Sequence, residues 1–217
     1  NVSCHGGNDG SAKVTVTGGS GTYTYLWSNT QTTDSAVGLI AGIYFVTVTD
    51  SLGCDTVLSV TINEPPILGA SFVVPSDIRA VSCHGGNDGS AKVTVTGGSG
   101  TYTYLWSDAL SQTTDSAVGL IAGTYFVTVT DSLGCDTVLD VTINEPPILG
   151  AEITVENIRN VSCHGGNDGS AKVTVTGGSG TYTYLWSDAL SQTTDSAVGL
   201  IAGTYFVTVT DSLGCDT

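Results

Sequence analysis

Apolar and polar residues alternate along several short stretches of the chain. In the first third of the sequence these stretches are Ala12–Thr17, Tyr44–Thr49 and Val57–Ile62. A period of two is typical of strands that bury one side and expose the other. Glycine-rich clusters such as residues 18–21 separate the stretches and supply turn residues. The pattern predicts an all-β fold, with about seven short strands per ~80 residues arranged as a two-sheet sandwich.

The same stretch of sequence occurs three times. Residues 81–137 and 161–217 are identical at every position, and the first copy is two residues shorter just after Trp27. Tandem copies of one module generate length, spacing or many weak contacts, whereas a catalytic centre is normally made once per chain. The repetition therefore favours a structural or adhesive array over an enzyme.

Paired prolines mark the expected boundaries between copies. The strand after Cys54 ends at Asn63-Glu64-Pro65-Pro66, and two adjacent prolines suit a stiff junction better than a strand interior. We expect β-sandwich domains at 1–66, 67–147 and 148–217. On this division Ala70–Val74 opens the second domain, the first domain lacks its opening strand, and the third lacks its closing strand.

Charge and hydropathy exclude two classes of partner. The net charge is −15 and the chain has only five lysines and arginines, so it offers few cationic side chains to contact the phosphates of a nucleic acid. No apolar run reaches the roughly 18 residues that a membrane span needs, and no signal peptide is visible. We expect neither nucleic-acid binding nor membrane insertion, and interpret the chain as a piece of a longer protein.

Three blocks of the middle copy resemble a known family. Ser82–Ala91, Gly97–Ser107 and Ala122–Cys135 are similar to the SprB-type repeat of Bacteroidota cell-surface proteins, and they also overlap the PKD-like and immunoglobulin-like sandwich pattern. The resemblance implies tandem immunoglobulin-like domains in a large, extracellular adhesin or filament. It also implies export by the type IX system, a role in gliding or in capturing surfaces and cells, and no catalytic residues.

Each copy contains two cysteines, an even count that indicates disulfides formed in an oxidising, extracellular compartment. We predict pairing within each copy: Cys4 with Cys54, Cys83 with Cys135, and Cys163 with Cys215. The immunoglobulin strand order raises a difficulty, because it tends to place these two positions at opposite ends of a domain, too far apart to be bridged. Pairing of Cys4 with Cys135 and of Cys83 with Cys215, across the junctions, therefore stays open.

Two further kinds of site have candidate residues. Asn8, Asp9, Asp50 and Asp55 offer calcium-ligating oxygens in glycine-rich turns, although the same strings are ordinary turn formers. We expect no other cofactor. Asp-Ser and Asp-Thr pairs before an aliphatic residue resemble the O-glycosylation acceptor of Bacteroidota, although Asp-Ser is also common in turns. The expected acceptors are Ser35, Ser51, Thr56, Ser116, Ser132 and Thr137, and in the third copy we place them at positions 197 and 213.

Aromatic residues separate the remaining interpretations. A glycan-binding, lectin-like array is the alternative to an adhesive fibre, and Trp27, Trp106 and Trp186 could serve it, but each ends an alternating strand and more naturally anchors the core.

The same alternation sends one leucine and one phenylalanine per copy to the outer face of the sheet. These pairs are Leu26 with Phe45, Leu105 with Phe126, and Leu185 with Phe206. Two interpretations of these outward pairs stay open: they form a patch for lateral self-association, or the loop Val37–Ile40 and its counterparts cover them.

Overall fold

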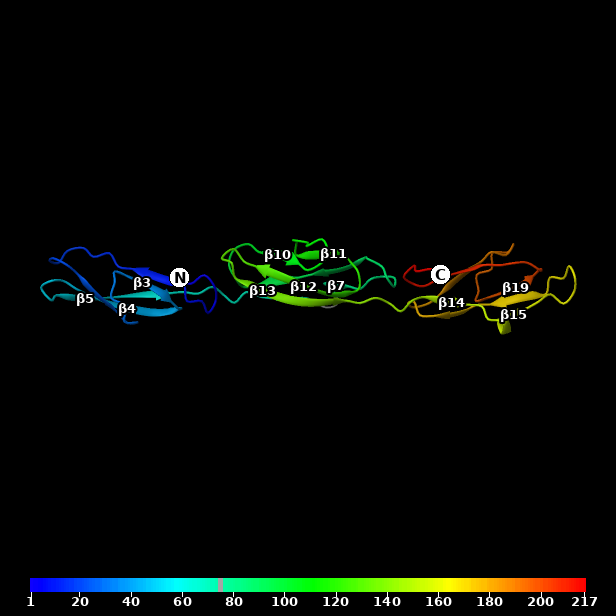
Figure 1. Cartoon of the computed structure of the whole chain (residues 1–217), viewed down its shortest axis with the longest axis horizontal. Helices are drawn as coiled ribbons and strands as arrows, with labels where there is room; N and C mark the ends of the chain where they lie inside the picture. The colour runs from blue at the N-terminus through cyan, green and yellow to red at the C-terminus, as the bar shows by residue number, and fades with distance from the viewer. Residues whose placement is uncertain (74–75) are drawn as a thin grey trace. The chain divides into compact units, whose positions relative to one another are not determined.

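The computed structural model describes residues 1–73 and 76–217 (Figure 1). In this part of the chain all regular structure is β-strand except one short 3-10 helix, η1 at Val155–Asn157. The all-β prediction is confirmed. None of the described residues form a helix that could cross a membrane.

Contacts between Cα atoms divide the chain into two compact units. The first comprises Asn1–Phe72, Val93–Asp115 and Phe126–Asp140, and the second comprises Val73–Lys92, Ser116–Tyr125 and Val141–Thr217. The division passes through the middle copy, so strands β12 and β13 run from one unit into the other. The expected domains at 1–66, 67–147 and 148–217 stay predictions.

The first copy lies entirely in the first unit and forms two sheets. One pairs β1 (Gly10–Lys13) with β3 (Ser35–Leu39), and the other has the order β2 (Thr24–Trp27), β4 (Gly42–Thr49), β5 (Asp55–Ile62). All pairs are antiparallel, and β4 and β5 are in register along their full length, from Gly42 opposite Ile62 to Thr49 opposite Asp55. Both stretches predicted as strands around residues 44–49 and 57–62 are confirmed.

The middle copy repeats these sheets and adds opening strands. Its strands are β6 (Gly69–Ser71), β7 (Ile78–Arg79), β8 (Gly89–Lys92), β9 (Thr94–Thr96), β10 (Thr103–Trp106), β11 (Ser116–Leu120), β12 (Gly123–Thr130) and β13 (Asp136–Ile143). The sheet orders are β7-β8-β11 and β10-β12-β13, with β6 paired to β9. In the lettering of an immunoglobulin-like sandwich these orders correspond to strands A-B-E and C-F-G. Val74, the expected end of the opening strand, lies outside the described residues.

The third copy follows the same order in the second unit. Its strands are β14 (Gly150–Glu152), β15 (Ile158–Arg159), β16 (Gly169–Lys172), β17 (Thr174–Thr176), β18 (Thr183–Trp186), β19 (Ser196–Leu200) and β20 (Val207–Thr210). The sheets are β15-β16-β19, β18-β20 and β14-β17. Beyond β20 the described residues add only an isolated bridge between Thr210 and Asp216.

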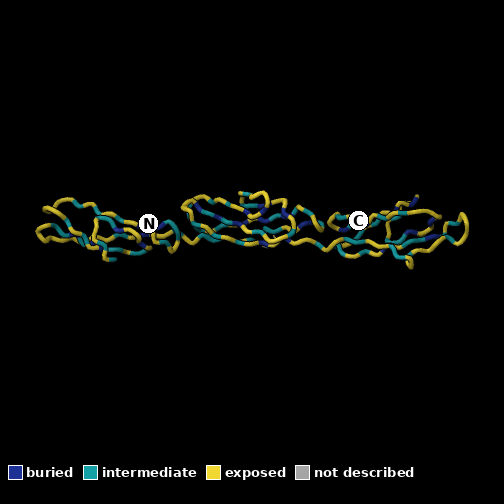
Figure 2. Tube along the Cα trace, in the orientation of Figure 1, coloured by how far each residue is buried: buried dark blue, intermediate teal, exposed yellow. Residues whose placement is uncertain are grey.

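Alternating burial along the strands builds the core. Figure 2 shows buried and exposed positions along the chain. In β4, Val46 and Val48 are buried while Phe45 next to Val46 is exposed, as a period of two requires. Trp27 is 2% exposed and its indole Nε1 donates a hydrogen bond to the Thr33 carbonyl at 2.9 Å. Trp106 and Trp186 are as deeply buried and donate in the same way to Thr114 and Thr194. All three tryptophans thus anchor the core.

Candidate functional site at the repeat junctions

The cysteines are paired across successive copies. Disulfides join Cys4 to Cys135 and Cys83 to Cys215, each with Cα atoms 5.6 Å apart, and Cys54 and Cys163 are exposed thiols. The predicted pairing within copies is therefore wrong. The structure has the alternative pairing across the junctions, which the sequence had left open. The reason is topological, because Cys83 lies between β7 and β8 while Cys135 lies in the β12-β13 hairpin, and these loops lie at opposite ends of an immunoglobulin-like strand order.

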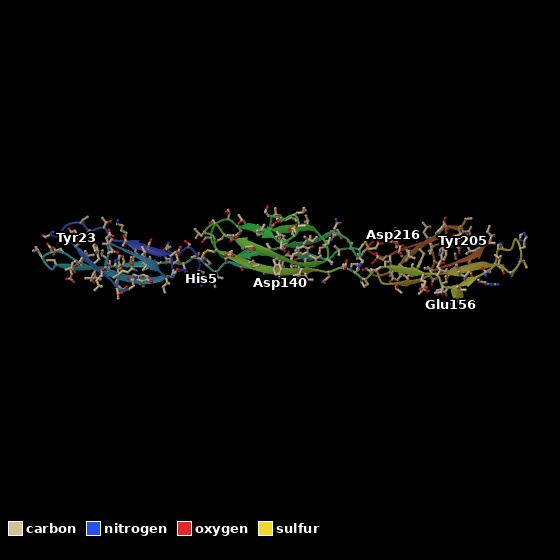
Figure 3. The ribbon with its side chains drawn as sticks, viewed as in Figure 1. His5, Tyr23, Asp140, Glu156, Tyr205 and Asp216 are labelled. Atoms are coloured by element: carbon tan, nitrogen blue, oxygen red, sulfur yellow. A yellow bond between two sulfur atoms is a disulfide. The ribbon has the colours of Figure 1, made fainter. Side chains whose placement is uncertain are left out.

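Each disulfide lies beside a linker that is held from both sides. At the first junction the loop of the first copy contacts the linker: the Val2 N–H donates to the Asn63 carbonyl at 3.0 Å and the Gly6 N–H to the Glu64 carboxylate at 2.7 Å. His5, labelled in Figure 3, has its Nδ1 3.2 Å from the Pro65 carbonyl. A histidine next to a cysteine thus serves here as a contact to the linker.

The following copy contacts the same linker through a glycine turn. The Gly98 N–H donates to the Pro66 carbonyl at 3.1 Å. Gly97 has φ +69°, and a Cβ at this position would lie 1.9 Å from the Ile67 carbonyl oxygen. Only glycine leaves room for the linker to pass, so the turn fits the linker closely. At the equivalent position of the first copy, Gly18 also has a positive φ, but nothing lies within 4 Å of the added Cβ.

The second junction reproduces these contacts. The Val81 N–H donates to the Asn144 carbonyl at 3.0 Å, the Gly85 N–H to the Glu145 carboxylate at 2.7 Å, and the Gly178 N–H to the Pro147 carbonyl at 3.1 Å. A Cβ on Gly177 would again lie 1.9 Å from a carbonyl oxygen, that of Ile148. Because both junctions have the same contacts, the junction geometry is a property of the repeat.

An aspartate fixes the loop that presents the second cysteine. One oxygen of Asp131 accepts the N–H groups of Leu133 at 2.9 Å and Cys135 at 3.0 Å, and the other accepts the Ser99 N–H at 2.9 Å. Burial alone would raise the pKa of Asp131, but the N–H groups of Cys135, Ser99 and Leu133 outweigh it and lower the pKa. Asp131 is therefore charged, and its carboxylate holds the backbone N–H of Cys135 in place.

A second aspartate organises the loop of the first cysteine. Asp88 accepts hydrogen bonds from the Ser82 hydroxyl at 2.5 Å and from the Ser82 N–H at 2.8 Å, one residue before Cys83. These two bonds lower the pKa of Asp88, with a smaller contribution from Arg79, whose guanidinium lies 2.9 Å away. Cys135 and Cys83, one cysteine from each disulfide, thus lie in loops whose backbone N–H groups are bound by an aspartate carboxylate.

The calcium candidates are not gathered into a site. Asp9 accepts hydrogen bonds from Ser3, and Asp50 accepts them from Leu52, Cys54 and Ser20. In the part of the chain that the structure describes, no three His, Cys, Asp or Glu side chains come together as metal ligands, so Asp9, Asp50 and Asp55 form no such group. Asp9 and Asp50 thus bind backbone N–H groups of their own loops, whereas Asp55 is the first residue of β5 and Asn8 lies in the loop before β1. Calcium binding stays a prediction.

Two of the expected glycosylation acceptors have no hydroxyl group. Positions 197 and 213 hold Ala197, which is fully buried in β19, and Leu213, which is 52% exposed and follows β20. Neither side chain contains an oxygen atom, so the prediction at these two positions is wrong. The hydroxyls of the corresponding Asp-Ser pairs belong to the preceding residues, Ser196 and Ser212.

Most of the hydroxyls in these pairs already make hydrogen bonds. Ser51, Ser132 and Ser212 are exposed, and each donates at 2.8 Å to a carbonyl of the glycine turn, at Ser20, Ser99 and Ser179. Ser35 and Ser196 are half-buried and donate to the preceding aspartate, Ser116 and Thr137 are half-buried, and Thr56 is exposed. Glycosylation at these positions stays a prediction.

The outward leucine and phenylalanine are exposed in every copy. Leu26 is 57% and Phe45 52% exposed, and the pairs in the later copies are exposed to a similar or greater extent. Leu26 lies opposite Thr47 in the β2-β4 ladder, which makes Phe45 its diagonal neighbour on the same face. The segment Val37–Ile40, expected as a loop over the pair, belongs to β3 up to Leu39, and the exposure of Leu26 and Phe45 shows that it does not hide them. We call each such pair the lateral patch.

The strand order and the repeated junctions define a tandem array of immunoglobulin-like modules. The family model of the SprB repeat matches residues 1–32, 76–111 and 155–191, one match in each copy. Each of the three copies therefore contains a match to the SprB repeat, as the resemblance implied. No curated protein matches the chain.

Solved structures give weaker likenesses. The N-terminal eight immunoglobulin domains of Down Syndrome Cell Adhesion Molecule align over 90% of this chain and 31% of theirs, at 10% identity and TM-score 0.37. Extracellular domains 3–5 of Drosophila OTK align over 89% of this chain and 83% of theirs, at 14% identity and TM-score 0.32. A tetra-tandem repeat from the extending region of a large adhesion protein aligns over 97% of this chain and 65% of its own, at 13% identity and TM-score 0.22. The immunoglobulin-like assignment rests on the strand order given above.

Proposed function

We propose that this chain is a structural segment of a large bacterial cell-surface adhesin or filament, which holds an adhesive part away from the cell or forms the fibre itself. The observation that carries the proposal is the pair of disulfides across successive near-identical repeats. Such bonds persist in an oxidising compartment, which supports an extracellular location. Export by the type IX system and a role in gliding or cell capture belong to the same proposal and rest on the family resemblance.

The buried tryptophans argue against the lectin-like alternative. Each indole ring is almost fully enclosed, so none is available to stack on a sugar. In the described residues no other observation favours a glycan site.

Surface labelling tests the location. An antibody raised against the 217-residue chain should label intact producing cells, and treatment of those cells with a protease together with a dithiol, which opens the disulfides, should remove the label. Labelling that appears only after the cells are permeabilised would contradict the proposal.

The lateral patches supply a candidate contact between parallel chains. The occupant we propose is a second copy of the same repeat, because Leu105 and Phe126 recur at the same register in each copy and many weak contacts add up through multivalency. Replacing Leu105 with Ser and Phe126 with Thr should weaken lateral association in sedimentation velocity and leave the unfolding transition in place. Leu110→Ser is the matched control, since Leu110 is 79% exposed but lies in a loop. Equal association in all three proteins would refute the lateral contact.

A further inference from the structure

We infer that the crossed disulfides make this array covalently redundant, so that one cut in the backbone anywhere between Cys4 and Cys215 does not sever it. Every junction then has two parallel covalent connections, the linker peptide and a disulfide. The inference concerns how the fibre survives damage, and it holds whatever surface the protein binds.

The redundancy follows from the overlap of the two closed loops. Cys4–Cys135 spans 131 residues and Cys83–Cys215 spans 132, and both loops contain the segment from Cys83 to Cys135. A cut before Cys83 leaves the first fragment attached through Cys4. A cut after Cys135 leaves the last fragment attached through Cys215. A cut between Cys83 and Cys135 leaves both bonds joining the two pieces.

Pairing within copies would not have this property. Bonds from Cys4 to Cys54 and from Cys83 to Cys135 would leave the stretch between Cys54 and Cys83 as the only connection between two copies. One cut there would separate the array. The crossed pairing protects the linkers as well as the copies, and exposed linkers are segments where proteases commonly act.

The segment between Cys54 and Cys83 contains an exposed arginine. The side chain of Arg79 is 64% exposed and lies on β7, a two-residue strand at the edge of its sheet. The only other arginine, Arg159, occupies the equivalent position after the second linker. An arginine-specific protease can therefore cut once in each inter-copy segment and nowhere else.

The same connectivity limits how far the chain extends under tension. The shortest covalent route from Cys4 to Cys215 crosses to Cys135, runs back to Cys83 and crosses to Cys215. It contains about 52 residues instead of about 211, so its fully extended length is ~180 Å instead of ~740 Å, at about 3.5 Å per residue. Unfolded repeats therefore stay tethered close to their neighbours, where they can refold.

Limited cleavage with an arginine-specific protease tests the inference. The exposed thiols of Cys54 and Cys163 are first alkylated so that the disulfides cannot exchange. Protein cut at Arg79 should keep its full mass on a non-reducing gel and separate into fragments 1–79 and 80–217 only with a dithiol. Each disulfide then accepts two electrons and two protons from the dithiol and yields two thiols.

A single substitution provides the matched control. In Cys4→Ser, a cut at Arg79 should release residues 1–79 without reductant, whereas a cut at Arg159 should release nothing because Cys83–Cys215 remains. If Arg79 resists cleavage in the folded protein, Ile67→Arg places a site in the linker itself, at a side chain that is 65% exposed. Release of fragment 1–79 or 1–67 from the otherwise unaltered, oxidised protein would overturn the inference.

Discussion

Replacing Gly97 with alanine should disrupt the first junction, and replacing Gly18 should not. Both residues have a positive φ, +69° and +80°, in equivalent turns of consecutive copies. An alanine in this region of backbone conformation costs about 1–2 kcal/mol in either place. The entropy that alanine removes from the unfolded chain is also the same in both, so it cancels in the comparison.

The difference between the two variants comes from the linker. The Cβ of Ala at 97 would lie 1.9 Å from the Ile67 carbonyl oxygen, whereas ordinary contact begins at 3.4 Å, so the linker must move by about 1.5 Å. That shift breaks the 3.1 Å hydrogen bond between the Gly98 N–H and the Pro66 carbonyl, worth about 0.5–1.5 kcal/mol. With the cost of local overpacking, Gly97→Ala should destabilise the protein by about 1–3 kcal/mol more than Gly18→Ala.

Urea unfolding followed by tryptophan fluorescence measures this difference, because the three buried tryptophans report on the cores of all three copies. Cleavage rates in the linker around residues 63–68 give a second readout, and should rise in Gly97→Ala alone. Equal free energies of unfolding for the two variants, within about 0.5 kcal/mol, would show that the glycine turn does not hold the linker.

Three other predictions test the core and the loops that carry the cysteines. Trp106→Ala should cost about 3–5 kcal/mol of unfolding free energy, whereas Leu110→Ala, on an exposed loop, should change it by less than about 0.5 kcal/mol; a small effect at Trp106 would contradict its role in the core. Because the pKa of Asp131 is lowered below its ordinary value of 3.8, its contribution to stability is present above that pH and lost as the pH falls further, so the difference in stability between wild type and Asp131→Asn at pH 7 should shrink as the pH falls below 3.8; a constant difference would contradict this. Cys83→Ser should destabilise the protein by roughly 4–5 kcal/mol, the chain entropy of a loop closed over more than 100 residues, and unchanged thermal unfolding would refute it.

Local patterns predicted the strands and their inward faces well. The alternation around Val46 and Val48 identified both the buried side of β4 and the exposure of Phe45, because a strand's two faces are determined by its own sequence. The stretch Ala12–Thr17 was less accurate: its equivalent in the middle copy divides into β8 and β9, which pair with different partners, β7 and β6. The partner with which a strand pairs depends on tertiary contacts, and the alternation of apolar and polar residues does not predict these contacts.

The junction could be predicted only in part. The Asn-Glu-Pro-Pro string indicated a stiff linker, but nothing in its spacing showed that Glu64 would accept the Gly6 N–H or that Gly97 would lie against Ile67. Cysteine spacing within a copy suggested a local bond, and only the strand order, which separates the two loops in space, favours the crossed pairing. The repetition of both Gly-Gly-Ser-Gly turn and Pro-Pro linker was the available signal that the two contact each other.

Peptide mapping without reduction tests the crossed pairing most directly. Trypsin can cut after the five basic residues, and the fragment with Cys83, residues 80–92, begins with Ala80, which distinguishes it from the otherwise identical fragments 1–13 and 160–172. With free thiols alkylated beforehand, fragment 80–92 should be found bonded to fragment 173–217, which contains Cys215. Finding it bonded to fragment 93–159, which contains Cys135, or as a free thiol peptide, would contradict the account.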